Sequence, residues 1–572
     1  MKIKKVEIKN FRSIIQGSFE IENILAIVGQ NNSGKSNILC ALDSFFHPDK
    51  QLENYLNNKN SCGIPRKNPC IEITFSEVPH EFDTFKNSEN NIKIKQSFSN
   101  NRLIYNIFNP TDGKYEIFDK NIKNYIDFVL IPIDRVSDVD GDKLPENSIV
   151  YKAIKNSLLK LSERRDTYSV QLQKAYEYID KHAFEKIAKD INNYYVASHV
   201  SAKIMKADNV DSTLLMSVLG ISISEKGKEY PINLCGSGIQ SLFVIGIYHY
   251  ISSQIGVNYL IAIEEPEVNL HPQAQRQFAN SLLNNTSNNQ VILSTHSPSI
   301  VDQLGHKDML LVKKISHPKK GFESKLTQLS SDFFERNGLD VLAYYKFAGF
   351  KNSDFFFSSH LIITESPTDG NVVKLLGEKY NIDLLNYGIS FVSLGGVCNF
   401  KYLYFLLKEL DIPHTWIFDK DYFLDYKNSK KENSRDSSGF FQYSNNWTND
   451  TTKKESIKKL FYDDSDRDKI LKFLTSNHQK ALTLMSRYNV ICMRYNLEMD
   501  ICSSKKSLEL YYDLLHIPPR ERNVKKILVD NKNAIKDATY IHKIIESLEN
   551  RNLPYSFKEI VKQLKKIINE SV

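Results

Sequence analysis

The segment ILAIVGQNNSGKS, residues 24–36, constrains the fold of this chain more than any other stretch. Its first five residues are apolar and predict a buried strand. The next eight, Gly29 to Ser36, match the pattern G-x-x-x-x-G-K-[ST], and the apolar spacing in SNILCALDSFF predicts a helix after them. A strand, a glycine-bearing loop and a helix in this order form a phosphate-binding turn. The sequence therefore predicts an α/β fold that binds a nucleotide.

The residue types of this loop suit a nucleoside triphosphate. Gly29 and Gly34 let backbone N–H groups curl around phosphate, and we assign Asn32, which lies between them, to the same site. Lys35 would neutralise charge on the β- and γ-phosphates, and Ser36 would bind Mg²⁺. We therefore expect ATP and Mg²⁺ at these residues.

The composition bounds the class of protein. With 572 residues the chain is longer than one hydrophobic core normally supports, so we expect two or three domains. Hydrophobic residues at 41% and charged residues at 25% are ordinary for a soluble globular protein. The net charge of +7 is a mild basic excess, which is compatible with nucleic-acid binding without being diagnostic of it.

The cysteines and the hydropathy pattern favour a cytoplasmic protein. None of the seven cysteines forms a CxxC pair, so free thiols in a reducing cytoplasm are a simpler interpretation than a zinc site. The first residues, MKIKKVEIKNFRSI, alternate charged and apolar side chains and do not form a signal peptide. No window approaches the ~18 consecutive apolar residues of a membrane span, so we expect no membrane partner.

Strand and helix patterns alternate along most of the chain. Alternating runs within 65–135 predict an antiparallel sheet, and strand–helix alternation over 215–313 and again from 360 predicts parallel α/β architecture. Residues 149–195 have helical periodicity without Gly or Pro, which fits a surface helix pair and a dimer contact about equally. Residues 424–456 are rich in Lys, Ser and Asn and predict a mobile polar insertion.

Three further motifs extend the nucleotide site. The strand YLIAI ends in Glu264-Glu265, where the first carboxylate suits the Mg²⁺ shell and the second suits activation of an attacking water. A second apolar strand, VILST, ends at His296, where a γ-phosphate sensor would lie. The stretch LCGSGIQS opens a helix, and its backbone donors with Ser237 would cap a phosphate of a second nucleotide.

Together these motifs resemble the ATP-binding-cassette (ABC) ATPases, most closely the branch that includes SMC proteins and RecF. The resemblance covers residues 1 to about 315. It implies a Walker A motif at 29–36, a Walker B residue in Glu264, a catalytic base in Glu265 and a switch residue in His296.

The same resemblance implies a signature motif and a nucleotide-contacting arginine. The signature residues are Gly236, Ser237 and Gly238 with Gln240, and the stretch IKNFRS places Arg12 near the nucleotide. Two features depart from the common ABC pattern: Walker B ends in Glu instead of Asp, and the signature lacks the Leu-Ser-Gly-Gly form. Both departures are usual for the overcoming-lysogenization-defect (OLD) group within this branch.

Acidic residues follow successive strands in the last third of the chain. Glu365 ends the strand HLIIT, Asp369 lies four residues further on, and Asp419 and Asp421 follow the strand HTWIF. Because the carboxyl ends of parallel strands meet at one edge of a sheet, these side chains should converge. Carboxylate oxygens suit Mg²⁺ or Mn²⁺, and two such ions about 4 Å apart could cleave a phosphodiester. A surface turn is the competing interpretation.

The order Glu365, Gly395-Gly396, Asp419-x-Asp421 resembles the Toprim domain of topoisomerases, primases and OLD nucleases. Ser366 replaces the usual glycine after the glutamate, which leaves both carboxylates in place. OLD nucleases bind a second metal further along the chain, and Glu498 and Asp500 are the candidates here, about equally matched by a solvated turn. The resemblance also implies a downstream lysine that stabilises the transition state, for which Lys536 is preferred over Lys532 and Lys543.

An ABC-type ATPase followed by a Toprim domain with helical C-terminal elements is the order of the OLD-family endonucleases, which include the Gabija nuclease subunit and retron-associated effectors. We expect ATPase lobes at 1–148 and 201–350, a helical insertion at 149–200 and the Toprim domain at 351–572. The resemblance implies ATP-gated, metal-dependent DNA cleavage in anti-phage defence by a homodimer or higher assembly.

Two alternatives stay open from the sequence. One is a RecF-like DNA-repair ATPase whose Toprim domain is structural, and the other is a toxin that cleaves RNA or tRNA. A partner encoded nearby would separate the defence systems, because a helicase indicates Gabija whereas a reverse transcriptase with its noncoding RNA indicates a retron.

Overall fold

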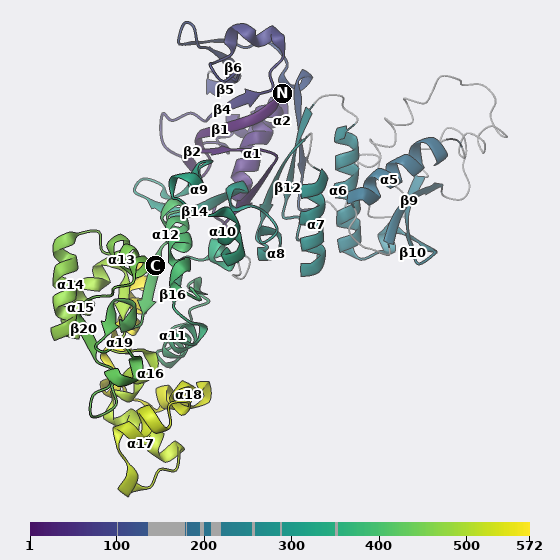
Figure 1. Ribbon diagram of the computed structural model, residues 1–572. Coiled ribbons are helices and arrows are strands. Elements are labelled where there is room, and N and C mark those ends of the chain that lie inside the picture. The colour runs from purple at the N-terminus through teal and green to yellow at the C-terminus, as the bar shows by residue number, and fades with distance from the viewer. Residues whose placement is uncertain are drawn as a thin grey trace, which may run out of the picture. The chain divides into compact units, whose positions relative to one another are not determined.

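The computed structural model divides into two compact units, Met1–Ser330 and Ser331–Val572, which are described one at a time (Figure 1). The residues that it describes are 1–99, 101–134, 178, 180–194, 200–206, 219–253, 258–285, 289–348 and 353–571. Most of the helical insertion predicted at 149–200 lies outside the described residues, so its role in dimerisation stays a prediction.

An antiparallel sheet forms the first layer of unit 1. Along β1 (Lys2–Phe11), Val6 and Ile8 are fully buried whereas the intervening charged residues reach solvent, as the period-two pattern of the sequence requires. The sheet confirms the predicted antiparallel layer. Its order is β2-β1-β4-β5-β6-β7, where the other strands are β2 Ile14–Glu20, β4 Cys70–Ser76, β5 Ile92–Ser99, β6 Arg102–Asn109 and β7 Lys114–Ile117.

A second sheet of unit 1 carries the nucleotide motifs. Five of its strands are parallel and β15 is antiparallel to β14, which confirms the predicted parallel α/β architecture. The carboxyl ends of β3, β12 and β13 therefore lie side by side, so the residues that follow them share one edge. The order is β15 (Gly321–Gln328), β14 (Met309–His317), β3 (Ile24–Val28), β13 (Gln290–Thr295), β12 (Asn258–Glu264) and β8 (Ile126–Ile131).

Helices complete unit 1. Helix α1 (Lys35–Phe46) follows the glycine loop, and α2 (Pro48–Leu56) follows α1. Helix α5 (Glu185–Tyr194) packs against α6 (Ser237–Ser253), and both can be followed in Figure 1. The remaining elements are β9 Val200–Lys206, β10 Leu219–Glu225 and β11 Lys228–Pro231, which form an antiparallel sheet, and the helices α7 Pro272–Asn285 and α8 Pro298–Val301.

Unit 2 is built on a parallel sheet of order β17-β16-β18-β21. Strand β16 (His360–Thr364) is buried along its whole length, and β18 (His414–Phe418) contributes the fully buried Trp416. Strands β21 (Val490–Cys492) and β17 (Ile389–Ser393) form the two edges of the sheet. Parallel pairing again collects the residues after β16 and β18 at one edge.

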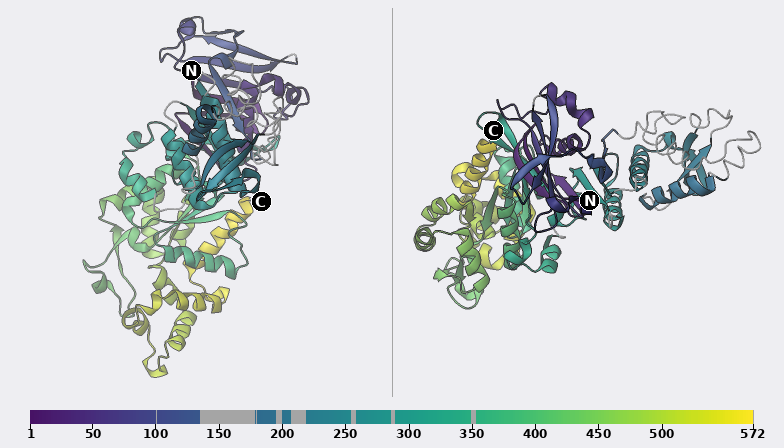
Figure 2. Two further views of the ribbon diagram at one scale, coloured as in Figure 1. Left: turned by 90° about the vertical axis from the view of Figure 1, so that its right-hand side faces the viewer. Right: turned by 90° about the horizontal axis from the view of Figure 1, so that it is seen from above.

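Helices surround this sheet. Helix α19 (Tyr555–Ser571), drawn in yellow in Figure 2, packs against β21 and α11 (Pro367–Lys379). The others are α9 Phe333–Arg336, α10 Val341–Ala348, α12 Phe400–Glu409, α13 Thr451–Leu460, α14 Asp464–Ser476, α15 His478–Met485, α16 Leu497–Cys502, α17 Lys505–Leu514 and α18 Ala538–Ser547. Their abundance agrees with the helical C-terminal region expected from the sequence.

The polar segment 424–456 contains regular structure. Strands β19 (Leu424–Tyr426) and β20 (Tyr443–Trp447) pair with each other, and α13 begins before the segment ends. Phe441 is buried between them. The segment therefore forms an excursion from the sheet with secondary structure of its own, and the mobility predicted for it stays a prediction.

Candidate nucleotide and metal sites

The phosphate-binding loop of unit 1 curls around its own lysine. Lys35 Nζ donates to the main-chain oxygens of Gly29 at 3.1 Å and Gln30 at 3.0 Å. Gly34 has φ +107°, and a Cβ there would collide with Ser324 Oγ. Only glycine therefore fits at this position, as in the tight glycine turns that wrap phosphate at the start of a helix.

The charge on Lys35 is poorly compensated inside the protein. Burial lowers the pKa of this ammonium to about 8, against a smaller opposing effect of Glu265 and Glu267. A buried cation of this kind gains most from a ligand that brings several negative charges. The loop thus suits the β- and γ-phosphates that the motif predicts.

Two predicted ATPase residues lie together at the strand edge. β12 ends at Glu264, and Glu265 follows with a φ of +41°. Glu265 Oε1 lies 3.7 Å from His296 Nε2, next to the end of β13. The structure therefore places the carboxylate assigned to water activation beside the predicted γ-phosphate sensor.

A third carboxylate of this cluster was not predicted from the sequence. Glu267 Oε1 accepts the main-chain N–H of His296 at 2.5 Å, and burial raises the pKa of this carboxyl. Glu267 lies two residues after Glu265 in the same acidic run, which is the signal that could have identified it. It fixes the backbone of His296, the predicted γ-phosphate sensor.

Arg12 lies against the first turn of α1. Its Nε donates to Asn60 Oδ1 at 2.9 Å and its Nη1 to Asn37 Oδ1 at 3.4 Å. Lys320 Nζ donates to the main-chain oxygen of Arg12. Because Asn37 is two residues after Lys35, Arg12 lies beside the nucleotide loop, in agreement with its predicted place.

The residues predicted to form the signature motif lie at the start of α6, where Gly236, just before the helix, and Ser237 are exposed. Gln240 Nε2 donates to the main-chain oxygens of Ile232 at 2.9 Å and Cys235 at 3.1 Å, so its amide closes the preceding turn. A Cβ on Gly238 would meet the main-chain oxygen of Asn269 at 2.5 Å, which shows that the helix packs closely on the loop after β12.

Three carboxylates converge at the sheet edge of unit 2. Glu365 follows β16, and Asp419 and Asp421 flank the turn after β18. One oxygen of each of these three residues lies within 4.8 Å of the others. Asp419 N–H donates to Glu365 Oε1 at 2.9 Å, which joins the two strand ends directly. The predicted convergence is therefore present in the structure.

Burial and mutual repulsion make this cluster costly without a cation. Burial, with a smaller effect of Asp421, raises the pKa of Glu365 to about 7. Burial, followed by the charge of Glu365, raises the pKa of Asp419 well above its ordinary value. Closely spaced carboxylates with raised pKa values fit a divalent ion, since the ion supplies the missing positive charge.

The other predicted acids divide into two groups. Asp369 Oδ2 accepts Ser366 N–H at 2.9 Å and thereby caps α11. Burial raises the pKa of both Asp369 and Asp419, and the charge of Glu498 on α16 adds a smaller effect in the same direction. Asp500 is fully buried elsewhere in α16. Its oxygens accept hydrogen bonds from three groups that are unrelated to the cluster, namely Arg494 N, Tyr495 N and Ser556 Oγ.

Lys536, the lysine preferred from the sequence, and Lys453 lie near different acidic residues. Lys536 ends the short 3-10 helix Ala534–Lys536, which packs against α16, the helix that carries Glu498. Lys453 Nζ, by contrast, donates to the main-chain oxygen of Asp421 at 2.6 Å. Sequence reasoning missed Lys453 because it lies in the polar segment that gave no motif.

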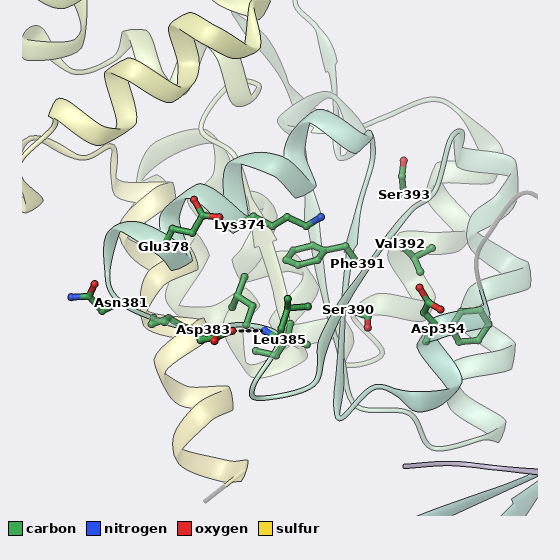
Figure 3. A pocket seen from close by; sticks show the side chains of 14 residues that line it. Asp354, Lys374, Glu378, Asn381, Asp383, Leu385, Ser390, Phe391, Val392 and Ser393 are labelled. Atoms are coloured by element: carbon green, nitrogen blue, oxygen red, sulfur yellow. Dashed lines mark hydrogen bonds between the residues drawn. The ribbon is translucent and has the colours of Figure 1, made fainter. Parts of the chain in front are cut away.

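A separate pocket of about 860 Å³ lies along the edge strand β17 (Figure 3). Figure 3 shows Lys374 beside the ring of Phe391, with its Nζ 5.2 Å from the ring centre. None of the converging carboxylates lines this pocket. The pocket is therefore distinct from the metal site.

The two sites together define a class: an ATPase head followed by a metal-binding TOPRIM domain. Residues 1–128 and 66–301 match the family described as AAA ATPase domain, and residues 356–421 match the family described as overcoming lysogenization defect protein-like, TOPRIM domain. The chain belongs to the AAA ATPase domain family and carries an OLD-like TOPRIM domain, which confirms the resemblance found in the motifs. Nucleotide and divalent-metal binding follow from these two domains.

Curated relatives support the same arrangement at modest identity. An OLD nuclease of Thermus scotoductus is 27% identical over 36% of this chain and 38% of its own length, so the match spans well under half of that relative. An Old nuclease of Escherichia phage P2 is 23% identical over 68% of this chain and 71% of its own. An endonuclease GajA of Bacillus cereus is 23% identical over 81% of this chain and 82% of its own.

Within the part of the chain that the structure describes, no helix combines the length and the apolar character needed to cross a membrane.

Proposed function

We propose that this protein is an ATP-regulated, metal-dependent endonuclease that hydrolyses phosphodiester bonds in DNA. The observation that carries the proposal is the convergence of Glu365, Asp419 and Asp421 within 4.8 Å at the edge of a parallel sheet. The relatives named nuclease and endonuclease support the same activity. The metal would supply Lewis-acid stabilisation of phosphate and a water of lowered pKa.

In this proposal the acidic residues have distinct tasks. Glu365, Asp419 and Asp421 hold one Mg²⁺ or Mn²⁺, and Asp369 with Glu498 holds a second. Asp500 is left out of the second set because its oxygens already hold the backbone at Arg494 and Tyr495. Two ions at this edge would place a phosphodiester between the two groups of carboxylates.

The ATPase unit regulates cleavage in the same proposal. Lys35 and Ser36 bind the triphosphate and its Mg²⁺, Glu265 orients water, and His296 contacts the γ-phosphate. Gly236, Ser237, Gly238 and Gln240 act on the nucleotide of a second copy, which requires a homodimer or a higher assembly. Such an enzyme suits anti-phage defence beside a helicase, or beside a reverse transcriptase with its noncoding RNA.

Substitution of Asp419 by Ala tests the nuclease directly. We expect Mg²⁺-dependent nicking of plasmid DNA to fall by about 10³-fold, because an oxygen ligand at the centre of the cluster is lost. Asp468→Ala is the matched control, since Asp468 is exposed on α14 away from the cluster. Unchanged nicking by Asp419→Ala would instead favour a RecF-like ATPase with a structural TOPRIM domain.

The substrate class needs its own experiment. Equal amounts of labelled plasmid DNA, RNA and tRNA are offered to the protein in one reaction with Mg²⁺ or Mn²⁺. Preferential cleavage of DNA supports the proposal, whereas preferential cleavage of RNA or tRNA identifies a toxin.

A further inference from the structure

A hydroxyl near the end of unit 1 reaches back to the nucleotide loop near its start. Ser324 lies in the middle of β15, and its side chain is buried. Its Oγ lies 2.5 Å from the main-chain oxygen of Ser33 and 2.7 Å from Ser13 Oγ. Ser33 belongs to the nucleotide loop, and Ser13 lies in the turn between β1 and β2. Ser324 therefore joins three segments that are distant in the chain.

The hairpin of β14 and β15 forms one wall of the nucleotide loop. Strand β14 pairs in parallel with β3, which leads into the loop. A Cβ on Gly29 would lie 2.2 Å from the main-chain oxygen of Val312 on β14, and a Cβ on Gly34 would lie 2.2 Å from Ser324 Oγ. Both glycines thus let the loop backbone approach the hairpin closely. This approach brings the Ser324 hydroxyl within reach of a loop carbonyl.

The direction of the hydrogen bonds follows from the chemistry of the groups. A carbonyl oxygen only accepts, so the single hydroxyl proton of Ser324 goes to the main-chain oxygen of Ser33. Ser13 Oγ accepts from Asn37 Nδ2 at 2.7 Å, which leaves the Ser13 proton for Ser324 Oγ. The bonds therefore run in series from α1 through the two serine hydroxyls to the loop carbonyl.

The bond to Ser33 sets the orientation of a backbone donor of the loop. In a trans peptide the C=O group and the N–H group of the next residue point in opposite directions. Because the Ser33 oxygen is directed at β15, the Gly34 N–H points away from that strand. Backbone N–H groups at the start of a helix bind phosphate, and α1 begins at Lys35. Ser324 thus orients a phosphate donor from the opposite side of the peptide.

We propose that Ser324 is a positioning residue of the nucleotide site and that it acts in series with Ser13. Its hydroxyl holds the Ser33–Gly34 peptide in the orientation that binds phosphate. The nucleotide then meets a loop that is already arranged, so less affinity is lost to ordering it. Ser324 lies outside every nucleotide motif of the sequence. This inference rests on the nucleotide binding that is part of the proposed function.

Removal of the hydroxyl should weaken nucleotide binding without removing binding sites. Ser324→Ala is expected to raise the dissociation constant of ATP with Mg²⁺ about tenfold, which corresponds to one lost hydrogen bond. Ser13→Ala leaves the last bond to the loop in place and should raise this constant only about threefold. Because the two hydroxyls act in series, the double variant should match Ser324→Ala and should not show the product of both effects.

Calorimetric titration of the full chain with ATP and Mg²⁺ measures the dissociation constant and the number of sites together. Thr327→Val is the matched control, since the Thr327 hydroxyl lies on the same strand and donates at 3.4 Å to the main-chain oxygen of Leu311 on β14. Lys35→Ala is the reference for loss of the site. Thermal midpoints without nucleotide report the stability of each variant. We expect Thr327→Val to bind ATP with wild-type affinity and stoichiometry.

The two measured quantities distinguish a positioning role from a purely structural one. A misplaced loop raises the dissociation constant of Ser324→Ala at an unchanged number of sites, as the proposal requires. A wild-type constant for this variant overturns the proposal, whether or not sites are lost or the midpoint falls, and leaves the proposed function intact. Multiplied effects in the double variant overturn the series arrangement with Ser13. If the wild-type chain binds no ATP, the nucleotide part of the proposed function fails together with this inference.

Discussion

The nucleotide loop and the carboxylate cluster present opposite charges to their ligands. Burial lowers the pKa of Lys35 to about 8, whereas burial with neighbouring acids raises the pKa of Glu365 to about 7. Each group is thus shifted toward its neutral form for lack of a counter-charge. The comparison teaches that one unit is prepared for a polyanion and the other for a cation.

The two sites also differ in how the chain assembles them. The nucleotide loop is one continuous turn from Gly29 to Ser36, positioned by β3 and α1. The metal cluster joins residues 54 positions apart, as in the bond between Asp419 N–H and Glu365. A local substitution should therefore disable one site without altering the other.

Among the changes that distinguish the two sites, removal of the loop lysine should have the largest effect on ligand affinity. Lys35→Ala is expected to weaken ATP binding by about 100-fold, since a charged donor to the phosphates is lost. Mn²⁺ binding to the carboxylates should not change. A fluorescent ATP analogue and Mn²⁺ titration measure the two affinities, with the exposed Lys50→Ala as control. A joint loss of both ligands would show that the two sites are not independent.

Ligand binding should release a proton at the carboxylate cluster and take up a proton at the nucleotide loop. Metal binding requires ionised Glu365 and should release a proton near pH 6–7, so Mg²⁺ affinity should rise about tenfold from pH 6 to pH 8. Nucleotide binding requires charged Lys35 and should take up a proton near pH 8–9. Calorimetry in buffers of different ionisation enthalpy measures the protons released and taken up. Glu365→Gln should abolish the release on metal binding, and Lys35→Ala should abolish the uptake on nucleotide binding.

The same shifts set the pH dependence of stability without ligands. The folded protein holds the Glu365 proton to about pH 7 although its ordinary value is 4.5, so this residue lowers stability as pH rises through that window. Lys35 loses its proton near pH 8 instead of 10.5, so its unfavourable effect disappears as pH rises from 8 to 10.5. Thermal midpoints measured with and without Mg²⁺ should show the acidic effect only in its absence.

The last prediction concerns two glycines that both have positive φ but different ψ, 17° at Gly34 and 147° at Gly396. Gly34→Ala should destabilise its unit by about 1–3 kcal/mol, because φ is +107° and a Cβ meets Ser324 Oγ. Gly396 has φ +144° with no atom nearer than 3.8 Å to a Cβ, so only backbone strain opposes Gly396→Ala, and the cost should be about 1 kcal/mol. Thermal unfolding measures both variants, and a wild-type midpoint for Gly34→Ala would contradict the strain and the close contact at Gly34.

Much of both sites could be predicted from the sequence where the geometry is local or follows from parallel pairing. The loop from Gly29 to Ser36 contains its strand, glycines and lysine in one run. Glu365, Asp419 and Asp421 follow buried strands, and parallel pairing alone brings such ends together.

The remaining features depend on tertiary packing. Asp500 has the spacing of a ligand in sequence, yet Ser556 Oγ and two backbone N–H groups occupy its oxygens. Tyr426 and Lys453 reach Asp421 only because β19 and α13 fold back onto the turn after β18. The polar composition of 424–456 hides this packing, because buried apolar residues such as Phe441 are few among its polar and charged residues.

The bond from Tyr426 Oη to Asp421 Oδ2, 2.8 Å long, has an evolutionary consequence. The sheet supplies the acids, but the excursion between β18 and β21 supplies the Tyr426 hydroxyl and the Lys453 ammonium, which both donate hydrogen bonds to Asp421. An exchange of this excursion for one of another length would leave the acids in place while altering ion preference and cleavage rate. The surroundings of Asp421 could thus change through the excursion alone, without any change in the strands of the sheet.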